Sequence, residues 1–390
     1  MKVIILICVG LSSLYWIGTA FSFWLIQRKV TVLEDEPVNG EMVFPMLSII
    51  KPACNEGIGL DEAMASVLLS DYPFLEIILV DDRSTDDTPL KADQWAQLDS
   101  RVKVIHLREL PEGWLGKVHA LYQGVKTSQG DWILFSDADV HLNRDTLKRA
   151  VSWAESQKLD FVGVLPQCLS SGYWVDSMVS VVMRTLSVGT RIWEIENPQS
   201  RASMGVGAFN LVRRRSFDKT PGFEWLKLEV ADDAGLGLMM KQSGAHCSIA
   251  NGRGLVTLHW YHSVNEFIIG LEKGGFANIG MYSHLRLWGM ILVMLVLELT
   301  PLVLFLAGPS GFYRWVGAFL LLLSLGLTLA ANHWFRRPLL PSLASPLGLM
   351  LLIYGIFRSG ILAWKQKGIY WRGTFYPTAI LKTGKRFRFP

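Results

Sequence analysis

The chain has 390 residues, of which 50% are hydrophobic and only 18% charged, and its mean hydropathy is +0.28. This balance is too apolar for an ordinary soluble enzyme. The four cysteines are scattered and argue against both a disulfide framework and a zinc site. The net charge of +4 lies largely beside apolar segments and in a basic C-terminal cluster, which favours anionic lipid headgroups over nucleic acid as a partner.

The first predicted element is a membrane anchor over residues 1–30. Its uncharged run, 3–26, is longer than the roughly 20 residues that a helix needs to cross a bilayer. No small-x-small cleavage site precedes Arg28 and Lys29, so a retained anchor is favoured over a cleaved signal peptide. Because these two cations follow the span, the positive-inside rule places the middle of the chain in the cytoplasm.

A globular α/β domain is predicted over residues 45–260. Apolar strands at 47–53, 75–80, 102–106, 132–136 and 161–165 alternate with helical patterns that start near residues 60, 89, 117 and 144. This alternation is typical of a mostly parallel sheet with crossover helices.

Acidic segments follow three of these strands, at 51–56 (KPACNE), 81–87 (DDRSTDD) and 137–139 (DAD). Ligands collect at the carboxyl ends of parallel strands, so the segments should form one acidic crevice. Each alone is consistent with a solvated turn, but three gathered carboxylate groups repel each other unless a cation or a donor-rich ligand joins them. Asp137 and Asp139 lie on the same side of an extended segment and could hold Mg²⁺ or Mn²⁺ against a diphosphate.

Taken in order, these motifs are PACNE at 52–56, VDDRSTD at 80–86, EGWLGK at 112–117 and SDAD at 136–139. The set resembles the signatures of family 2 glycosyltransferases with the GT-A fold. The EGWLGK segment resembles the GWxGK motif of the membrane-anchored hopene-associated and carotenoid-ester glycosyltransferases, and ceramide glucosyltransferases are wider relatives. The resemblance covers residues 47–250, and the layout of one N-terminal and about three C-terminal spans extends it to the whole chain.

The resemblance implies a role for each matching residue. The positions that would bind the nucleotide sugar are Ala53, Glu56, Asp81, Asp82, Lys117 and Asp137. The divalent cation, Mg²⁺ or Mn²⁺, would be held by Asp139 together with Asp137. For Lys117, a surface lysine on a helix is the alternative interpretation.

Further site residues are expected later in the chain. Asp233 matches the position of the family's catalytic base, and Asp232 beside it is either a pocket residue or a helix N-cap. Gly205 and Gly207 lie in a small-residue stretch that would line the sugar and acceptor pocket, where glycine lets the backbone approach a ligand. His259 is a candidate for binding the acceptor or the leaving phosphate, the alternative being an aromatic interface.

Three segments are expected to contact the membrane: 173–194, 261–284 and 285–364. The first is predicted to be an interfacial helix, with an ordinary buried helix as the alternative, and the second an interfacial linker. The third contains candidate spans at 287–307, 315–331 and 347–364. Glu298 within a span is either functional or a neutral, hydrogen-bonded carboxyl.

The basic tail, 365–390, conflicts with this layout, because three C-terminal spans would place it outside the cell. Either one apolar segment is re-entrant or interfacial, or the tail is external.

The function expected from the resemblance is that of a multi-pass membrane glycosyltransferase with its catalytic domain on the cytoplasmic side. It would transfer a sugar, with inversion, from a nucleotide sugar such as a UDP-sugar to a hopanoid, carotenoid, sphingolipid or glycerolipid. Two alternatives remain at this point. A polysaccharide synthase is disfavoured because the QxxRW-like motif is missing, and a catalytically silent nucleotide-sugar-binding scaffold is disfavoured because the expected aspartates are intact.

Overall fold

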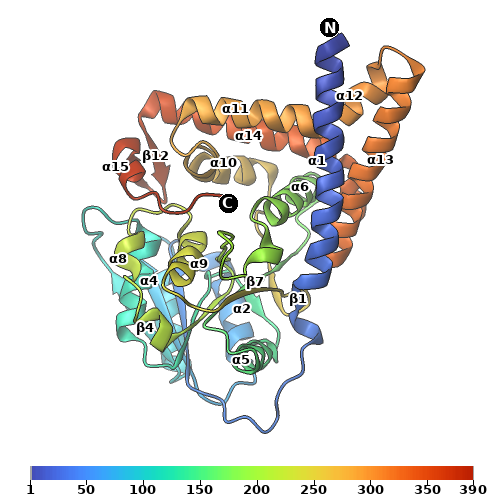
Figure 1. The fold of residues 1–390 in the computed structure, drawn as a ribbon. Coiled ribbons are helices and arrows are strands. Elements are labelled where there is room, and N and C mark those ends of the chain that lie inside the picture. Colours follow the sequence, from blue (N-terminus) through green and yellow to red (C-terminus); the bar gives the residue numbers. More distant parts are fainter. Residues whose placement is uncertain (1, 390) are drawn as a thin grey trace. The chain divides into compact units, whose positions relative to one another are not determined.

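The computed structural model describes residues 2–389 and divides into two compact units (Figure 1). The α/β unit consists of Val30–Leu169, Ile192–His259 and the end of the chain from Thr383. The helical unit consists of the chain up to Lys29, Ser170–Arg191 and Trp260–Lys382. Both units are therefore assembled from segments that are distant in the sequence.

An eight-stranded sheet forms the centre of the α/β unit, in the order β1-β10-β7-β9-β5-β2-β3-β4. The strands are β1 (Thr31–Val32), β2 (Leu47–Ala53), β3 (Leu75–Asp82), β4 (Val102–Leu107), β5 (Trp132–Phe135), β7 (Phe161–Leu165), β9 (Asn210–Arg213) and β10 (Cys247–Asn251). All neighbours pair in parallel except β9, which is antiparallel to β5 and β7. The predicted, mostly parallel α/β fold is therefore confirmed.

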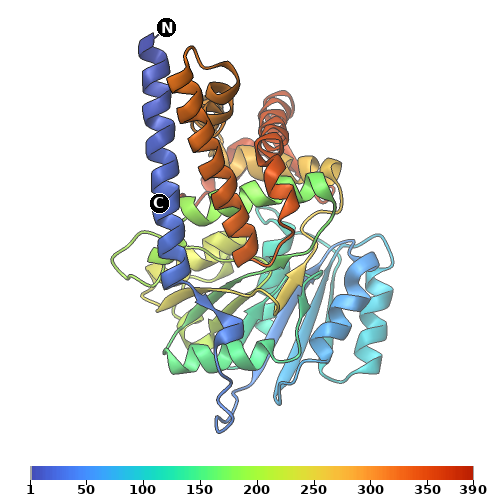
Figure 2. The ribbon, with the colours of Figure 1, turned by 90° about the vertical axis from the view of Figure 1, so that its right-hand side faces the viewer.

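Helices pack beside this sheet (Figure 2). They are α2 (Gly57–Leu68), α3 (Thr88–Leu98), α4 (Gly116–Thr127), α5 (Thr146–Ser156) and α9 (Asp232–Gln242), with the short α7 (Arg214–Phe217) and α8 (Phe223–Leu226). Helix α4 packs on β2 and β3, α3 on β4, and α5 on β7. Because the sheet is covered in this way, β3 is buried along its whole length, and its central residues 77–80 (IILV) form a continuous apolar run. A smaller sheet has the order β6-β11-β8, formed by His141–Leu142, Val256–Leu258 and Gln167–Cys168.

The helical unit contains four segments that are long and apolar enough to cross a membrane, one N-terminal and three C-terminal, as predicted. Its helices are α1 (Lys2–Lys29), α6 (Tyr173–Gly189), α10 (Val264–Gly274), α11 (His284–Met294), α12 (Thr300–Ala307), α13 (Gly311–Trp334), α14 (Ser345–Gln366) and α15 (Thr378–Thr383). The π-helical turn η4 (Leu295–Leu299) separates α11 from α12. A hairpin of β12 (Gly368–Trp371) and β13 (Thr374–Pro377) follows α14.

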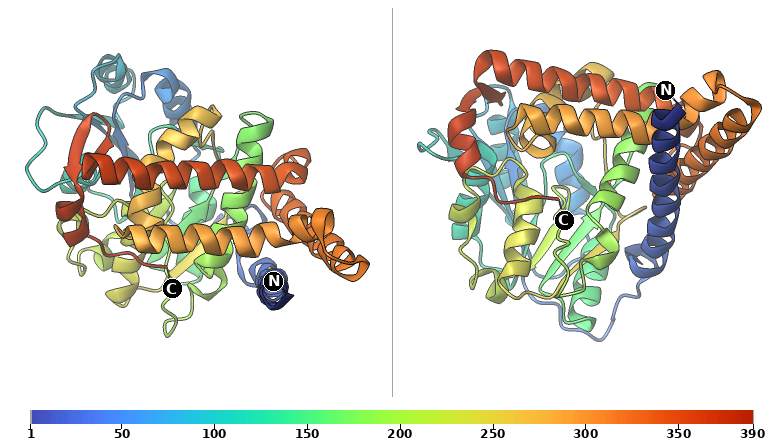
Figure 3. Two further views of the ribbon diagram at one scale, coloured as in Figure 1. Left: turned by 90° about the horizontal axis from the view of Figure 1, so that it is seen from above. Right: turned by 45° about the horizontal axis from the view of Figure 1, so that its top comes forward.

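Within this unit the long helices run in two directions. Helices α12 and α13 pack against each other and against α1, whereas α11 packs beside α14. The pair α11 and α14 runs across the direction of α1 and α13 (Figures 1 and 3). The change of direction between α11 and α12 occurs at η4, as expected of a π-helical insertion in a helix.

A buried ion pair connects three segments of the helical unit. The guanidinium of Arg184 in α6 donates to both carboxylate oxygens of Glu298 in η4, at 3.1 and 2.7 Å. The two side chains are only 3% and 7% exposed. The Tyr15 hydroxyl donates to the same carboxylate, and the guanidinium carbon lies 4.7 Å from the ring centre of Trp16 in α1. Glu298 therefore has a cationic partner, which neither interpretation of the sequence included.

Candidate active site

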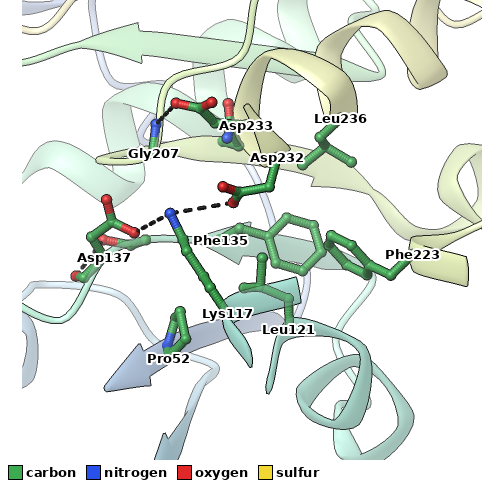
Figure 4. A pocket seen from close by; sticks show the side chains of 12 residues that line it. Pro52, Lys117, Leu121, Phe135, Asp137, Gly207, Phe223, Asp232, Asp233 and Leu236 are labelled. Atoms are coloured by element: carbon green, nitrogen blue, oxygen red, sulfur yellow. Dashed lines mark hydrogen bonds and ion pairs between the residues drawn. The ribbon is translucent and has the colours of Figure 1, made fainter. Parts of the chain in front are cut away.

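The candidate site lies at the carboxyl ends of β2 and β5, next to the start of α4 and α9 (Figure 4). These elements bring together residues that are up to about half the chain apart in sequence. The small pocket between them is lined by Pro52, Lys117, Leu121, Phe135, Ser136, Asp137, Gly207, Asn210, Phe223, Asp232, Asp233 and Leu236. Four of the predicted site residues, Lys117, Asp137, Asp232 and Asp233, are thus brought together, along with Gly207.

Lys117 is the cation of this pocket. Its ammonium lies 2.7 Å from Asp137 Oδ1 and 3.2 Å from Asp232 Oδ2. Burial alone would lower the pKa of Lys117, but the carboxylates of Asp137, Asp232 and Asp233 outweigh burial and raise it well above its usual range. The side chain is 24% exposed and is held by both carboxylates within the pocket lining. Lys117 provides a permanent positive charge between two acidic segments.

The glycine-rich segment before β9 packs tightly on the acidic pair that begins α9. The Gly207 N–H donates to Asp233 Oδ2 at 3.0 Å, and the Asp137 N–H donates to the Gly207 carbonyl at 3.0 Å. A Cβ atom on Gly205 would lie 1.9 Å from the Asp233 carbonyl oxygen, and one on Gly207 would lie 2.6 Å from Asp137 Oδ2. Only glycine permits this approach.

Ala231 occupies the N-cap position of α9, and Asp232 lies inside the first helical turn. The N-cap interpretation of Asp232 is therefore wrong. Its carboxylate points to Lys117, and two acidic residues in a first turn are favourable beside the positive end of the helix dipole.

Four of the predicted nucleotide-sugar-binding residues do not line this pocket and lie at or near the carboxyl ends of β2 and β3: Ala53, Glu56, Asp81 and Asp82. Ala53 of β2 pairs in register with Asp81 of β3, and both are buried. Asp81 accepts hydrogen bonds from the Ser84 N–H at 3.1 Å and from His106 Nδ1 at 2.9 Å. The hydrogen bond to Asp81 raises the pKa of His106, and a second hydrogen bond to Asp93 raises it further.

Asp82 and Glu56 complete this group. Asp82 is 5% exposed and forms an ion pair of 2.8 Å with Arg83 Nε. Glu56 stands just before α2, where its backbone N–H donates to Thr88 Oγ1 at 2.9 Å. The four positions therefore lie at the carboxyl ends of the adjacent strands β2 and β3, or within three residues after them.

Asp139 follows β5 and is half-buried. Burial raises the pKa of Asp139 most strongly, and the charge of Asp137 raises it further. The charge of Lys51 lowers this pKa. Two carboxylates that disfavour each other's ionisation suit a divalent cation, which would relieve the repulsion. Within residues 2–389 no group of three or more His, Cys, Asp and Glu side chains forms a larger metal-binding cluster. Asp137 and Asp139 thus offer a partial ligand set that substrate phosphates would complete.

Lys51 is a residue that sequence reasoning did not assign to the site. It is fully buried in β2, and its ammonium donates to the Asp137 carbonyl at 2.7 Å and to Ser136 Oγ at 3.4 Å. Burial lowers its pKa to about 8, although Asp139 and Asp137 oppose the shift. The signal was a single cation inside the apolar strand LSIIKPA. Lys51 holds the loop that carries both aspartates.

His259 directly follows β11 and does not line the pocket. Burial lowers the pKa of His141 in β6, and both Asp139 and His259 act on that histidine electrostatically.

Glu229 is a second residue that sequence reasoning missed. It is fully buried three residues before Asp232, and its Oε1 accepts from the Ala231 N–H at 3.1 Å. The end of the chain supplies its other partners. Lys385 Nζ lies 2.9 Å from Oε1, and the backbone N–H groups of Arg386 and Phe387 donate to Oε2 at 2.5 and 2.9 Å. Part of the basic tail is thus bound by the acidic loop that leads to α9.

Known proteins resemble this chain in sequence and in fold. Residues 48–220 match the family model "Glycosyl transferase family 2". The chain is 24% identical over 260 residues to the 4,4'-diaponeurosporenoate glycosyltransferase of Staphylococcus haemolyticus, covering 65% of this chain and 68% of the relative. It is also 24% identical over 278 residues to the beta-monoglucosyldiacylglycerol synthase of Nostoc, covering 66% of this chain and 56% of the relative.

A solved structure shares the fold. The mannosyltransferase PcManGT from Pyrobaculum calidifontis, in complex with GDP-Man and Mn²⁺, superimposes with a TM-score of 0.55 at 18% identity, covering 93% of this chain and 99% of that one. Other curated relatives match over only 121 and 117 residues, and the chain spans 34% and 45% of their length.

Proposed function

Because residues 48–220 form a family 2 glycosyltransferase domain with a GT-A-like fold, we propose that the protein transfers a sugar from a nucleotide sugar to a membrane lipid. The observation that carries the proposal is the placement of Lys117 between Asp137 and Asp232, with Asp233 held by the Gly207 N–H. A displacement at an anomeric carbon needs positive charge beside the leaving diphosphate and an oriented carboxylate that takes the proton of the acceptor, and Lys117 and Asp233 suit these two tasks.

The donor would lie along the strand ends. The nucleoside of a UDP-sugar would be bound by Ala53, Glu56, Asp81 and Asp82, and its diphosphate would face Lys117. Asp137 and Asp139 would hold a divalent cation, Mg²⁺ or Mn²⁺, which supplies positive charge against that diphosphate. Lys51 keeps the loop of both aspartates fixed through the Asp137 carbonyl.

Asp233 would act as the general base. Its carboxylate takes the proton of the acceptor hydroxyl while that oxygen forms a bond to the anomeric carbon. The bond between the anomeric carbon and the diphosphate breaks, and the nucleoside diphosphate leaves with the electron pair. Attack from the face opposite the leaving group inverts the anomeric configuration. The Gly207 N–H orients the base by holding its Oδ2.

The acceptor is proposed to be a lipid, such as a carotenoid, hopanoid, sphingolipid or glycerolipid. The names of relatives that act on a diaponeurosporenoate and on a diacylglycerol support this class, as do the four apolar segments. Arg28 and Lys29 after the first of these segments favour a cytoplasmic site. Gly205 and His259 are proposed to border the acceptor side.

The test is release of nucleoside diphosphate by the detergent-purified chain. UDP- and GDP-sugars are supplied with Mn²⁺ or Mg²⁺, with and without a total lipid extract. We expect release from one donor that depends on lipid and is abolished by EDTA. Asp233→Asn should reduce it about 100-fold or more, and Asp139→Ala should abolish it with either metal, as EDTA does. Asp218→Asn, at an exposed aspartate outside the pocket, should not change it.

Each result has a defined meaning. Normal turnover of Asp233→Asn would refute the assignment of the base, and release that is indifferent to EDTA would refute the metal. Release that needs no lipid would refute the acceptor class. If no nucleotide sugar binds at all, the proposal as a whole is wrong.

A further inference from the structure

We propose that α14 lies in the membrane interface and does not cross the bilayer, so that the chain crosses with α1 and the α12–α13 hairpin. The exposed apolar face of α14 would then contact lipid acyl chains along its whole length. This inference concerns the membrane-bound surface of the protein and does not depend on the proposed function.

The first argument comes from the end of the chain. The segment from Thr383 onward belongs to the α/β unit, where Lys385 pairs with the buried Glu229. Gly384 is packed so closely on Leu228 that a Cβ atom would lie 2.3 Å from that side chain. A segment bound inside the α/β unit must be on the same side of the membrane as that unit.

The number of crossings between His259 and Thr383 is therefore even. Three segments in this stretch are apolar enough to cross: His284–Ala307, Gly311–Trp334 and Leu340–Gln366. One of these three segments must therefore either re-enter the side of the membrane from which it came or remain in the membrane interface. The same reasoning applies to α6, which leaves the α/β unit after Leu169 and re-enters it at Ile192, so α6 alone cannot be a crossing helix.

The two faces of α14 identify it as the helix that does not cross. Its exposed large side chains recur every three to seven residues on one face and are 45% to 70% exposed: Leu347, Met350, Tyr354, Phe357 and Trp364. The opposite face is covered by protein, since a Cβ atom on Gly348 would lie 2.4 Å from Ser177 Oγ of α6. An apolar stripe opposite a covered face suits a helix that lies in the plane of the membrane.

Burial and charge agree with this assignment. Half of the most apolar window of the α14 segment is buried inside the protein, against 17% for that of α1. Arg358 lies in the second half of α14 and forms an ion pair with Glu272 of α10. A guanidinium at this position is costly deep in a bilayer and is tolerated near its surface.

The directions of the helices complete the argument. Helix α14 runs beside α11 and across α1 and α13, so it cannot share the membrane normal with them (Figure 3). Segments η4 and α12 together contain 13 residues, which rise about 20 Å, less than the roughly 30 Å of hydrocarbon. Helix α11 therefore lies within the near leaflet.

A cavity of about 330 Å³ lies between α11 and α14 and is lined by Trp288 and Trp364 with His284, Gly360 and Ile361. Tryptophan is the side chain that is typical of the membrane interface. Trp364 belongs both to this lining and to the exposed apolar stripe of α14.

The first experiment measures on which side of the membrane three exposed sites lie. Lys219→Cys in the α/β unit, Ser310→Cys between α12 and α13, and Arg388→Cys in the tail are each made in a background without the four native free cysteines. Sealed vesicles are treated with a membrane-impermeant maleimide, and permeabilised vesicles give the total labelling of each cysteine. We expect the first and third sites to react from one side and Ser310→Cys from the other. Reaction of Arg388→Cys from the side of Ser310→Cys, or of all three from one side, would overturn the proposal.

The second experiment measures depth in the bilayer with nitroxide labels. Leu347 and Tyr354 are seven residues apart on the exposed face of α14, and Phe312 and Phe319 are a matched exposed pair on α13. Seven helical residues span about 10 Å, so the α13 labels should differ in depth by nearly that distance. The α14 labels should differ by only a few ångströms. Depths that differ as much on α14 as on α13 would refute the interfacial position.

Discussion

The most informative perturbation is the removal of residues 385–390 from the end of the chain. Glu229 is 0% exposed and Lys385 is 7% exposed, so solvent screens their ion pair very little. The truncation removes the ammonium and two backbone N–H groups from the carboxylate and leaves only the Ala231 N–H. The buried charge would then be nearly without compensation.

The magnitude follows from these contacts. Removing one partner of a buried ion pair costs about 3–5 kcal/mol, which is a large share of the roughly 5–15 kcal/mol that stabilises a typical domain. We therefore expect the truncated chain to lose about 3–5 kcal/mol. The loop that begins at Glu229 also precedes Asp232 and Asp233, so nucleoside diphosphate release should fall together with stability.

The assay is a double-mutant cycle on the detergent-purified full chain, read by urea unfolding. The truncation is combined with Glu229→Leu, which removes the buried charge, and Lys382→Ala serves as a control because that side chain is exposed. Truncation should lower the free energy of unfolding much less in the Glu229→Leu background than in the native one. An equal cost in both backgrounds would refute the assignment of the tail as the partner of Glu229.

Three further predictions concern other contacts. Arg184→Leu leaves the carboxylate of Glu298 buried without its cation and should cost about 3–5 kcal/mol in detergent unfolding. His106→Gln should lower the melting temperature at pH 6 and much less at pH 9. Bonding to Asp81 raises the pKa of His106, so its contribution is fully present below the unfolded-state pKa of about 6.5 and is lost as pH rises through the folded-state pKa. Gly205→Ala should lower nucleoside diphosphate release about 100-fold, because its Cβ would displace the Asp233 backbone.

Matched variants control these three experiments. Adding Glu298→Leu to Arg184→Leu should restore most of the lost stability, and a failure to do so would refute the ion-pair argument. His246→Gln, at an exposed histidine, should show no such pH dependence. Gly40→Ala, where a Cβ atom would meet nothing within 4 Å, should leave product release unchanged; an equal loss there would refute the packing argument.

The sequence predicted the sheet well because its strands are buried on both faces. β2 and β7 have the predicted bounds, Leu47–Ala53 and Phe161–Leu165. β3 extends two residues further than predicted, because Asp81 and Asp82 remain paired in register with His106 and Leu107 of β4. A charged residue ends an apolar pattern in sequence, but it does not end a hydrogen-bonded ladder.

The site was predictable where its residues lie in short motifs and unpredictable where their partners are distant. Asp137, Lys117 and Asp233 were found from their motifs, and the pocket brings them together. Lys51 was missed because its partner is a backbone carbonyl, which no sequence pattern marks. Glu229 was missed because Lys385 lies 156 positions away along the chain.

The placement of the tail also has a consequence for how the protein is made. Residues from Thr383 onward leave the ribosome after every apolar helix, yet they complete the α/β unit. A chain that lacks these residues has Glu229 without Lys385, so we expect its loop before α9 to be less stable than in the full chain. Folding of the loop that carries Asp232 and Asp233 is thereby tied to synthesis of the apolar helices that precede the tail.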